Sequence, residues 1–193
     1  MITYREIDRR FFAQYDQIPM NVPVTCELRP VKADGGLGGI LLREVPVTPY
    51  AKDLSQYEIA SEYENEFDIS NWKFFMAFDG EKPVGGITLA SRTENVQMLD
   101  GRDDLCVLWD IRVHDAYKRR GIGANLFALG KQWAAGSGLR QMKIECQNNN
   151  LPACKFYRRQ GAVLSAINEY AYYQDTTICN EIQLIWYLDL VNQ

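Results

Sequence analysis

The sequence predicts an α+β fold built on a mixed, mostly antiparallel sheet. Two observations carry this prediction. Several β-rich runs occur in pairs around short glycine turns, which is the pattern of antiparallel hairpins. In the second half of the chain, two helical segments each separate one strand from the next, as crossover helices do. Hairpins combined with crossovers indicate a sheet that holds both antiparallel and parallel pairs.

The first 50 residues are expected to form a helix followed by a hairpin. Phe11, Phe12 and Tyr15 lie on one helical face, which predicts a helix within the first 20 residues. Two β-rich runs, 22–31 and 38–47, then flank a glycine cluster. No Lys-Ser or Lys-Thr pair follows these glycines and no helix starts there, so we interpret the cluster as a hairpin turn rather than a phosphate loop.

The middle of the chain predicts an acidic helix and a second hairpin. Residues 48–67 are helical in character and rich in glutamate. Two strands within 72–91 meet at Asp79-Gly80, a strong hairpin signal. A polar turn is expected over 92–104, followed by a nearly continuous apolar run, Leu105–Val113, which predicts a central buried strand.

The rest of the chain alternates helices and strands. A helix is expected from the glycine turn through Ala135, ended by the Gly136-Ser137-Gly138 stretch. A strand at 141–147 leads to a short helix at 151–160 that Gly161 closes. Two final strands are expected at 167–174 and 181–190, completing one ordinary domain over 1–193.

Composition narrows the functional classes. The chain has 193 residues, 47% hydrophobic and 24% charged, with a net charge of −4, so it is globular and a poor general ligand for nucleic acid. No membrane span or signal peptide is apparent. The five scattered cysteines indicate buried, reduced thiols in a cytoplasmic protein. With His114 as the only histidine, we expect no metal site.

The stretch YKRRGIGANL, Tyr117–Leu126, is the main candidate for ligand binding. A glycine turn that opens a helix offers unpaired backbone N–H groups and a positive dipole end to an anion. Lys118, Arg119 and Arg120 add charge at the rim, and the combination fits a pyrophosphate. Neither a Walker A loop nor the third glycine of a dinucleotide fingerprint is present. An ordinary turn with a solvated basic face remains the alternative.

A second stretch, QNNNLPACKFYRRQGA, selects among these readings. Lys118-x-x-Gly121-x-Gly123 resembles the pyrophosphate loop of the GNAT N-acetyltransferases, and the residues from Asn150 through Ala153, Phe156 and Tyr157 to Gly161 resemble that family's later motif. Further stretches along most of the chain, among them VPVTCELRPV, IECQNNNLPACKFY and LIWYLDL, are similar to the streptothricin acetyltransferases.

The resemblance implies a GNAT-type sheet flanked by helices, with an extra N-terminal hairpin within 1–50 and an acetyl-CoA-binding core at 105–162. It implies acetyl transfer from acetyl-CoA to the amine of a small cationic substrate, with a streptothricin-like antibiotic favoured, and hence antibiotic resistance. Another polyamine, aminoglycoside or peptide amine, or a CoA-binding module without turnover, remains open. A homodimer is possible. Lys118 in place of Arg or Gln, and Ala162 in place of Phe, depart from the family pattern but leave the backbone donors intact.

The resemblance also assigns residues to the cosubstrate. The strand before the glycine turn is expected to bulge and to pair its backbone with the pantetheine arm. The expected acetyl-CoA contacts are Ile111, Val113, Lys118, Arg119, Arg120, Gly121, Ile122, Gly123, Ala124 and Asn150. Asn150 also suits the cap of the short helix, since Asn accepts well from the first helical N–H groups.

Two residues are candidates for proton transfer. Tyr157 matches the family tyrosine that protonates the departing CoA thiolate, although it could simply be a packed helix residue. Asp110 is the one carboxylate in an apolar strand, where burial would raise its pKa toward that of a general base. Asp110 could equally be a water relay, a structural carboxylate or a substrate ligand. A covalent role for Cys154 is disfavoured, because no histidine is near it in sequence.

Acidic and aromatic residues are candidates for the acceptor site. Carboxylates attract an ammonium group and aromatic rings offer cation–π contact. The candidates are Glu62, Glu66, Trp72 and Glu181. A solvated helix face is the alternative for the acidic segment.

Overall fold

The computed structural model describes residues 1–190, and its contacts divide the chain into two compact units. Unit 1 comprises Met1–Asn21, Asp53–Ile144 and the described chain from Tyr187 on. Unit 2 comprises Val22–Lys52 and Glu145–Trp186. Among the described residues, no helix is long and apolar enough to cross a membrane.

Unit 1 is built on a sheet whose strands run in the order β1-β4-β5-β6-β7. The strands are β1 (Ile2–Glu6), β4 (Lys73–Asp79), β5 (Lys82–Ser91), β6 (Leu105–Val113) and β7 (Gln141–Gln147), and β7 continues into unit 2. The β1/β4, β4/β5 and β5/β6 pairs are antiparallel, whereas β6 and β7 are parallel. The mixed, mostly antiparallel sheet is therefore confirmed.

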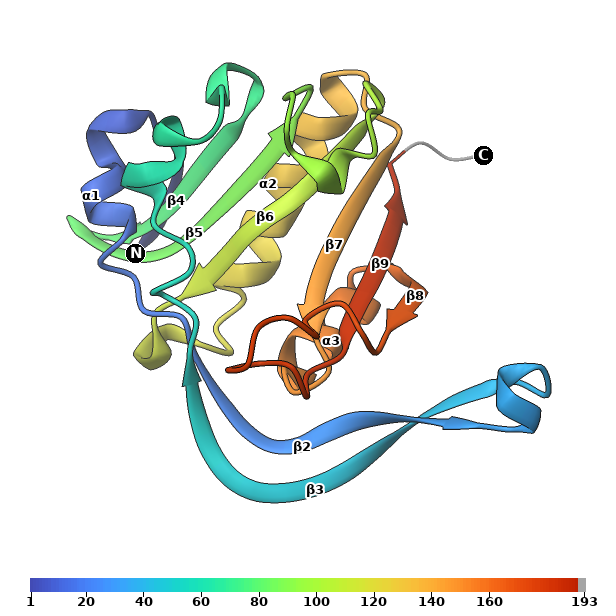
Figure 1. Ribbon diagram of the computed structural model, residues 1–193. Coiled ribbons are helices and arrows are strands. Elements are labelled where there is room, and N and C mark those ends of the chain that lie inside the picture. Colours follow the sequence, from blue (N-terminus) through green and yellow to red (C-terminus); the bar gives the residue numbers. More distant parts are fainter. Residues whose placement is uncertain (191–193) are drawn as a thin grey trace. The chain divides into compact units, whose positions relative to one another are not determined.

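Helices cover both faces of this sheet. The long helix α2 (Ile122–Gly136) packs on β4, β5 and β6, which lie side by side in Figure 1. Because neighbouring strand residues face opposite sides of a sheet, Gly85 lies on the face that α2 covers and Gly86 on the face that α1 covers. A Cβ at Gly85 would lie 2.9 Å from Ile122, and one at Gly86 would clash with the ring of Tyr15, in the short helix α1 (Phe12–Tyr15).

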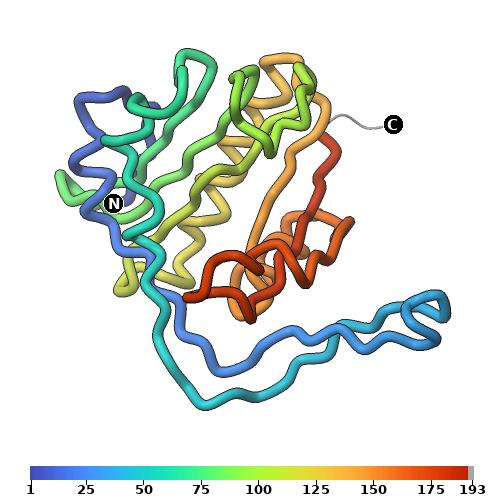
Figure 2. The backbone as a smooth tube through the Cα atoms, in the orientation of Figure 1, coloured from blue at the N-terminus to red at the C-terminus, as the bar shows by residue number. Residues whose placement is uncertain are grey.

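The cover around α1 is completed by the segment between β3 (Ile40–Asp53) and β4. This segment winds through short turns, which Figure 2 traces, and includes 3-10 turns at Ala60–Asn65 and Ile69–Asn71. Asp16, just after α1, accepts hydrogen bonds from the backbone N–H groups of Ala60 and Ser61 at 2.7 and 3.2 Å. The segment buries an aromatic cluster against the sheet, made of Tyr63, Phe67, Trp72, Phe74 and Trp109.

Unit 2 contains a two-stranded hairpin and the end of the chain's last crossover. The hairpin pairs β2 (Asn21–Lys32) with β3 (Ile40–Asp53), as predicted. The crossover helix α3 (Leu151–Arg159) follows β7, and β9 (Gln183–Asp189) lies between β7 and β8 (Val163–Asn168). Asn148 connects the hairpin to the segment before β9. Its backbone and its side-chain amide each form hydrogen bonds with the backbones of Leu28 and Ile182, at 2.9–3.0 Å.

The expected helix over the first 20 residues is wrong in extent. Residues 2–6 form β1, which pairs with β4 in the register Ile2↔Asp79 to Glu6↔Phe75, so pairing with a distant strand overrides the local helical pattern. The helical part shrinks to the 3-10 turn Arg9–Phe11 and the four residues of α1. Phe12 and Tyr15 are nevertheless buried on one face, as the spacing indicated.

Two further expectations are corrected. The acidic segment 48–67 is not an α-helix, since β3 extends to Asp53 and the remainder forms turns. The penultimate strand lies at Val163–Asn168 rather than at 167–174. Tyr170 and Tyr173 are 75% and 74% exposed in a turn region that begins where the Asn168 side chain accepts from the Tyr170 N–H. The Asp79-Gly80 hairpin, β6, α2, β7, α3 and β9 are confirmed.

Candidate active site

Strand β6 carries a β-bulge at Trp109. Thr88 pairs with Asp110 and Leu89 pairs with Leu108, which leaves Trp109 as the extra residue on β6. On the other edge, the parallel pairing with β7 ends at Leu108, opposite Ile144. From the bulge onward, β6 is therefore paired with β5 but no longer with β7.

Ile111 and Val113 direct their backbone groups to that open edge. The His114 N–H donates to the Val84 carbonyl at 2.9 Å, which makes this opposed pair a hydrogen-bonded one. Hydrogen-bonded and non-hydrogen-bonded pairs alternate along antiparallel strands. Ile111 and Val113, opposite Ile87 and Gly85, are thus in non-hydrogen-bonded positions toward β5. Their N–H and C=O groups point away from β5, where an extended ligand can pair with them.

The glycine turn presents the N-terminus of α2 without a side-chain cap. Gly121 caps the helix in the left-handed region, at φ 81°, and no described atom lies within 4 Å of the position its Cβ would take. The N–H groups of Ile122, Gly123 and Ala124 precede the first intrahelical bond, which runs from Asn125 to Gly121. Uncapped donors and the helix dipole make this end suited to an anion.

The basic side chains of the turn are engaged or lie at its rim. Lys118 forms an ion pair with Asp115 at 2.6 Å and donates to the Asn21 carbonyl at 2.7 Å. The Arg120 guanidinium lies 5.0 Å from the centre of the Tyr117 ring, and Arg119 has a φ of 62°. All three cations are exposed. The backbone, rather than these side chains, is the part of the turn that is directed and unpaired.

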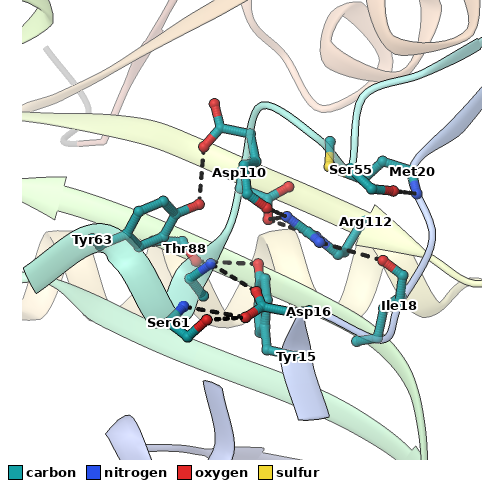
Figure 3. Close-up of polar contacts among 12 residues, drawn as sticks. Tyr15, Asp16, Ile18, Met20, Ser55, Ser61, Tyr63, Thr88, Asp110 and Arg112 are labelled. Carbon is teal, nitrogen blue, oxygen red and sulfur yellow. Dashed lines mark hydrogen bonds and ion pairs between the residues drawn. The ribbon is translucent and has the colours of Figure 1, made fainter. Parts of the chain in front are cut away.

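Asp110 belongs to a buried polar network beneath the α1 cover (Figure 3). Its Oδ2 accepts from Nε of Arg112 at 2.7 Å, and both side chains are fully buried. Arg112 donates in turn to the backbone carbonyls of Ile18 and Glu58, at 3.3 and 2.7 Å. The pair thereby connects β6 to the segment after α1, at Ile18, and to the segment before β4, at Glu58.

Burial raises the pKa of Asp110, although the Arg112 charge and hydrogen bond act to lower it. The Tyr15 hydroxyl also acts on this carboxyl without reaching normal hydrogen-bond geometry to Oδ1, which lacks a partner among the described residues. Since Asp110 is 3% exposed and ion-paired, its geometry is that of a structural carboxylate more than of a group that meets a substrate.

Glu58 is a titratable residue that the sequence analysis did not single out. Its Oε2 accepts from the Tyr63 hydroxyl at 2.9 Å, and the residue as a whole is half-buried. Desolvation and the negative charge of Asp110 raise the pKa of Glu58 to about 7, against the lowering effects of Tyr63, Trp109 and Arg112. No local pattern in the acidic segment distinguishes this glutamate from its neighbours, because its perturbing groups come from distant positions.

Within unit 1, the expected acceptor residues Glu62, Glu66 and Trp72 do not line one pocket. Trp72 is 5% exposed, and its indole N–H donates to Thr93 at 2.9 Å. It lines a pocket of ≈ 810 Å³ with Phe67, Glu64 and Asp68, whereas Glu62 and Glu66 are exposed and do not line that pocket. In unit 2, Glu181 forms a largely buried ion pair with Lys52.

The start of α3 follows the expected capping pattern. The Asn150 side chain accepts from the Ala153 N–H at 3.2 Å, so Asn150 caps this helix. Tyr157 is buried, at 6% exposed. Cys154 is 3% exposed and its sulfur lies 3.4 Å from that of Cys146. All five cysteines are free; Cys106, Cys146 and Cys154 are buried, as predicted, whereas Cys26 and Cys179 are half-buried, contrary to the expectation of buried thiols.

The bulged strand and the glycine turn at an uncapped helix agree with the GNAT fold that the sequence predicts. Residues 41–162 match the Acetyltransferase (GNAT) family, and the chain belongs to that family. It is 28% identical over 149 residues to a streptothricin acetyltransferase of Escherichia coli, a match that covers 77% of this chain and 76% of the relative.

Solved structures share the fold. A Bacillus anthracis str. Ames acetyltransferase in complex with acetyl coenzyme A has a TM-score of 0.77 at 24% identity, covering 98% of this chain and 99% of that one. A nourseothricin acetyltransferase has a TM-score of 0.76 at 22% identity, with the same coverage. The GNAT-type fold is thereby confirmed.

Proposed function

We propose that this enzyme transfers an acetyl group from acetyl-CoA to a primary amine of a small cationic substrate, with a streptothricin-like antibiotic as the favoured acceptor. The observation that carries the proposal is a pair of directed backbone segments, the free edge of β6 at Ile111 and Val113 and the uncapped start of α2. The N–H groups of Ile122–Ala124 can bind a pyrophosphate, and the free backbone groups of Ile111 and Val113 can form hydrogen bonds with the amides of a pantetheine arm.

The two ligand-binding segments divide the cosubstrate between them. The uncapped N–H groups after Gly121 hold the pyrophosphate, and Lys118, Arg119 and Arg120 supply general positive potential around it. Asn150 is assigned a second contact with the pantetheine arm beside its capping bond to Ala153. Acetyl-CoA is the cosubstrate in this scheme.

Tyr157 is assigned the role of acid toward the departing CoA thiolate. A phenol is a suitable proton donor to a thiolate leaving group, since their ordinary pKa values lie close together. Tyr157→Phe should therefore keep acetyl-CoA affinity within about twofold and lower kcat by about 10- to 100-fold. Isothermal titration and stopped-time assays of CoA release separate the two effects, and full turnover in the variant would remove the assignment.

The acceptor is assigned from chemistry and from the relatives. The exposed carboxylates Glu62 and Glu66 would raise the local concentration of a cation, whereas Trp72 would act from its pocket, which the two glutamates do not line. In unit 2, Glu181 is ion-paired with Lys52, and its role as a substrate ligand stays a prediction from the sequence. The E. coli relative is named for streptothricin, which supports a streptothricin-like acceptor at 28% identity.

The test measures CoA release from acetyl-CoA with a panel of amines. Streptothricin, an aminoglycoside, spermidine and a peptide with a free N-terminus are compared at equal concentration. Release with streptothricin alone supports the favoured acceptor. Release with another member selects that amine class instead. Acetyl-CoA binding without release from any amine would leave a CoA-binding module and overturn the proposal.

A further inference from the structure

The open edge of β6 sets a direction for the cosubstrate. If the pyrophosphate is bound at Ile122–Ala124, the pantetheine arm passes Val113 first and Ile111 second. These two residues are about 6.7 Å apart along the strand. Two residues before Ile111, beyond Asp110, lies the bulge residue Trp109. The acyl end of the cosubstrate is thus expected beside the bulge, and the groups that border the bulge are the ones that can act on the acceptor amine.

Glu58 borders this bulge through several independent contacts. The indole N–H of Trp109 faces the Glu58 carboxylate and acts to lower its pKa, yet it does not reach normal hydrogen-bond geometry and has no other partner among the described residues. The backbone carbonyl of Glu58 is held by Arg112 at 2.7 Å. Its Oε2 is held by Tyr63 at 2.9 Å, and the Tyr63 ring lies 6.1 Å from the nearest ring centre of Trp109.

This arrangement differs from that of Asp110 in accessibility. The side chain of Asp110 is fully buried and is neutralised by Arg112. Glu58 is half-buried as a residue, and within unit 1 its Oε1 receives no hydrogen bond from the described residues. Glu58 therefore has an oxygen that an acceptor ammonium group can approach, and it has the rigid support that a proton-transfer group requires.

We propose that Glu58 is the base that removes the proton from the acceptor ammonium group, and that the Asp110–Arg112 pair is the positioning device that holds it. The inference rests on the acetyltransferase function proposed above. The charged and titratable groups that face Glu58 are Tyr63, Asp110 and Arg112, with Tyr15 behind them. With the pKa of Glu58 near 7, a useful fraction is the free carboxylate at neutral pH.

The step balances as follows in atoms and charge. The ammonium group R–NH3⁺ gives one proton to the Glu58 carboxylate and becomes a neutral amine. The nitrogen lone pair forms the C–N bond at the thioester carbonyl carbon, and the C–S bond breaks with its electron pair on sulfur. The nitrogen passes its second proton to solvent water, the thiolate takes one proton from the acid assigned above, and that acid regains a proton from solvent. Glu58 releases its proton to solvent. The products are the amide, CoA–SH and one H⁺.

The experiment compares Glu58→Gln with wild type over pH 5.5–9.5, using saturating acetyl-CoA and whichever amine the wild-type enzyme acetylates. Gln keeps the size of Glu and an acceptor oxygen for Tyr63 but cannot take a proton. We expect kcat/KM to fall by about 100-fold or more and the acidic limb near pH 7 to disappear, while the Kd for acetyl-CoA stays within about twofold. Glu94→Gln, at an exposed glutamate of the same unit, is the matched control and should behave as wild type.

A second variant guards against a purely structural effect. Glu58→Ala removes the carboxylate and leaves space near Trp109, so formate or acetate in the buffer should restore part of the rate in proportion to its concentration. A glutamate that only supports the fold would not show this rescue. Retention of the acidic limb in Glu58→Gln, or loss of acetyl-CoA binding together with activity and no rescue, overturns the inference.

The two proposals fail in different ways. If the wild-type enzyme releases no CoA with any amine, the acetyltransferase function fails and the role of Glu58 fails with it. If wild type and Glu58→Gln release CoA with the same rate and the same pH profile, only the role of Glu58 fails.

Discussion

The glycine turn and the buried polar network of unit 1 offer two kinds of site. The turn is made from backbone: uncapped N–H groups at Ile122–Ala124, with the side chain of Lys118 already paired to Asp115. The network is centred on the side chain of Arg112, which binds the Asp110 carboxylate and the backbone carbonyls of Ile18 and Glu58, from three separate segments. Figure 3 shows how Tyr15, Asp110 and Arg112 converge there. A backbone site needs only a local conformation, whereas a side-chain site needs the whole unit to be assembled.

This difference predicts opposite responses to substitution. A change in the turn should alter ligand affinity with little effect on folding, because exposed residues surround it. A change in the network should alter stability and proton affinity, because its charges are buried and each one depends on its partner. The predictions below test that division, beginning with the largest expected effect.

Arg112→Met should be the most damaging single change. It leaves Asp110 buried without its ion-pair partner and frees the carbonyls of Ile18 and Glu58. Removing one partner of a buried ion pair costs about 3–5 kcal/mol, and urea unfolding followed by circular dichroism measures the loss. The double variant Asp110→Leu/Arg112→Met is the control, since it removes both charges and should recover much of the stability. If Arg112→Met lowers the free energy of unfolding by less than about 1 kcal/mol, the ion pair is accessible to water rather than buried.

Gly123→Val should weaken acetyl-CoA binding by about 100-fold, which corresponds to about 2.7 kcal/mol. The branched side chain shields the N–H groups at the start of α2 that an anion would use. Lys118→Ala should weaken binding by less than about fivefold, because Lys118 is exposed and engaged by Asp115 and the Asn21 carbonyl. Isothermal titration on both variants, with thermal melts to confirm folding, tests the order. The reverse order would make the turn a charge patch.

The sequence alone predicts the turn well and the network poorly. Strand β6, the glycine turn and α2 follow from local signals: an apolar run, two glycines and helical spacing. Asp110 stands out because it is a carboxylate in an apolar strand. Its partner Arg112 is two residues away, yet nothing in the local pattern indicates that both side chains turn inward.

Glu58 and β1 were missed for the same physical reason. The raised pKa of Glu58 depends on Asp110, more than 50 residues away, and β1 becomes a strand only by pairing with β4. Non-local contacts of this kind leave no periodic trace in the segment that makes them. The tyrosine-rich stretch at 167–174 shows the opposite error, a predicted strand that does not form. Its residues are typical of strands, but Tyr170 and Tyr173 are exposed in turns.

Asp110→Asn separates the two candidate bases by their pH profiles. Asp110 raises the pKa of Glu58, and its loss also leaves the Arg112 charge uncompensated. Both effects lower the pKa of Glu58, so the acidic limb of kcat/KM should move toward lower pH by about one unit and remain visible. If Asp110 were itself the base, the limb would flatten instead. Initial rates at eight or more pH values between 5 and 9 distinguish a displaced limb from a lost one.

The smallest effect concerns stability rather than rate. The pKa of Glu58 is about 7 in the folded protein, against 4.5 for an ordinary glutamate. Between these values the folded state holds a proton that the unfolded state has released, so this residue's contribution to stability declines as pH rises from about 4.5 through 7. Glu58→Gln cannot ionise and should lack that decline.

Relative to wild type, Glu58→Gln should therefore gain stability between pH 5 and pH 8, by about 1 kcal/mol, since water partly screens a half-buried carboxyl. Urea unfolding of both proteins at each pH measures the difference. The raised pKa of Asp110 contributes to both curves and largely cancels when they are subtracted, because Asp110 keeps its partner Arg112 in each. A difference that does not change with pH would show that Glu58 has an ordinary pKa, and the distinction between the backbone site and the side-chain site would then rest on Asp110 alone.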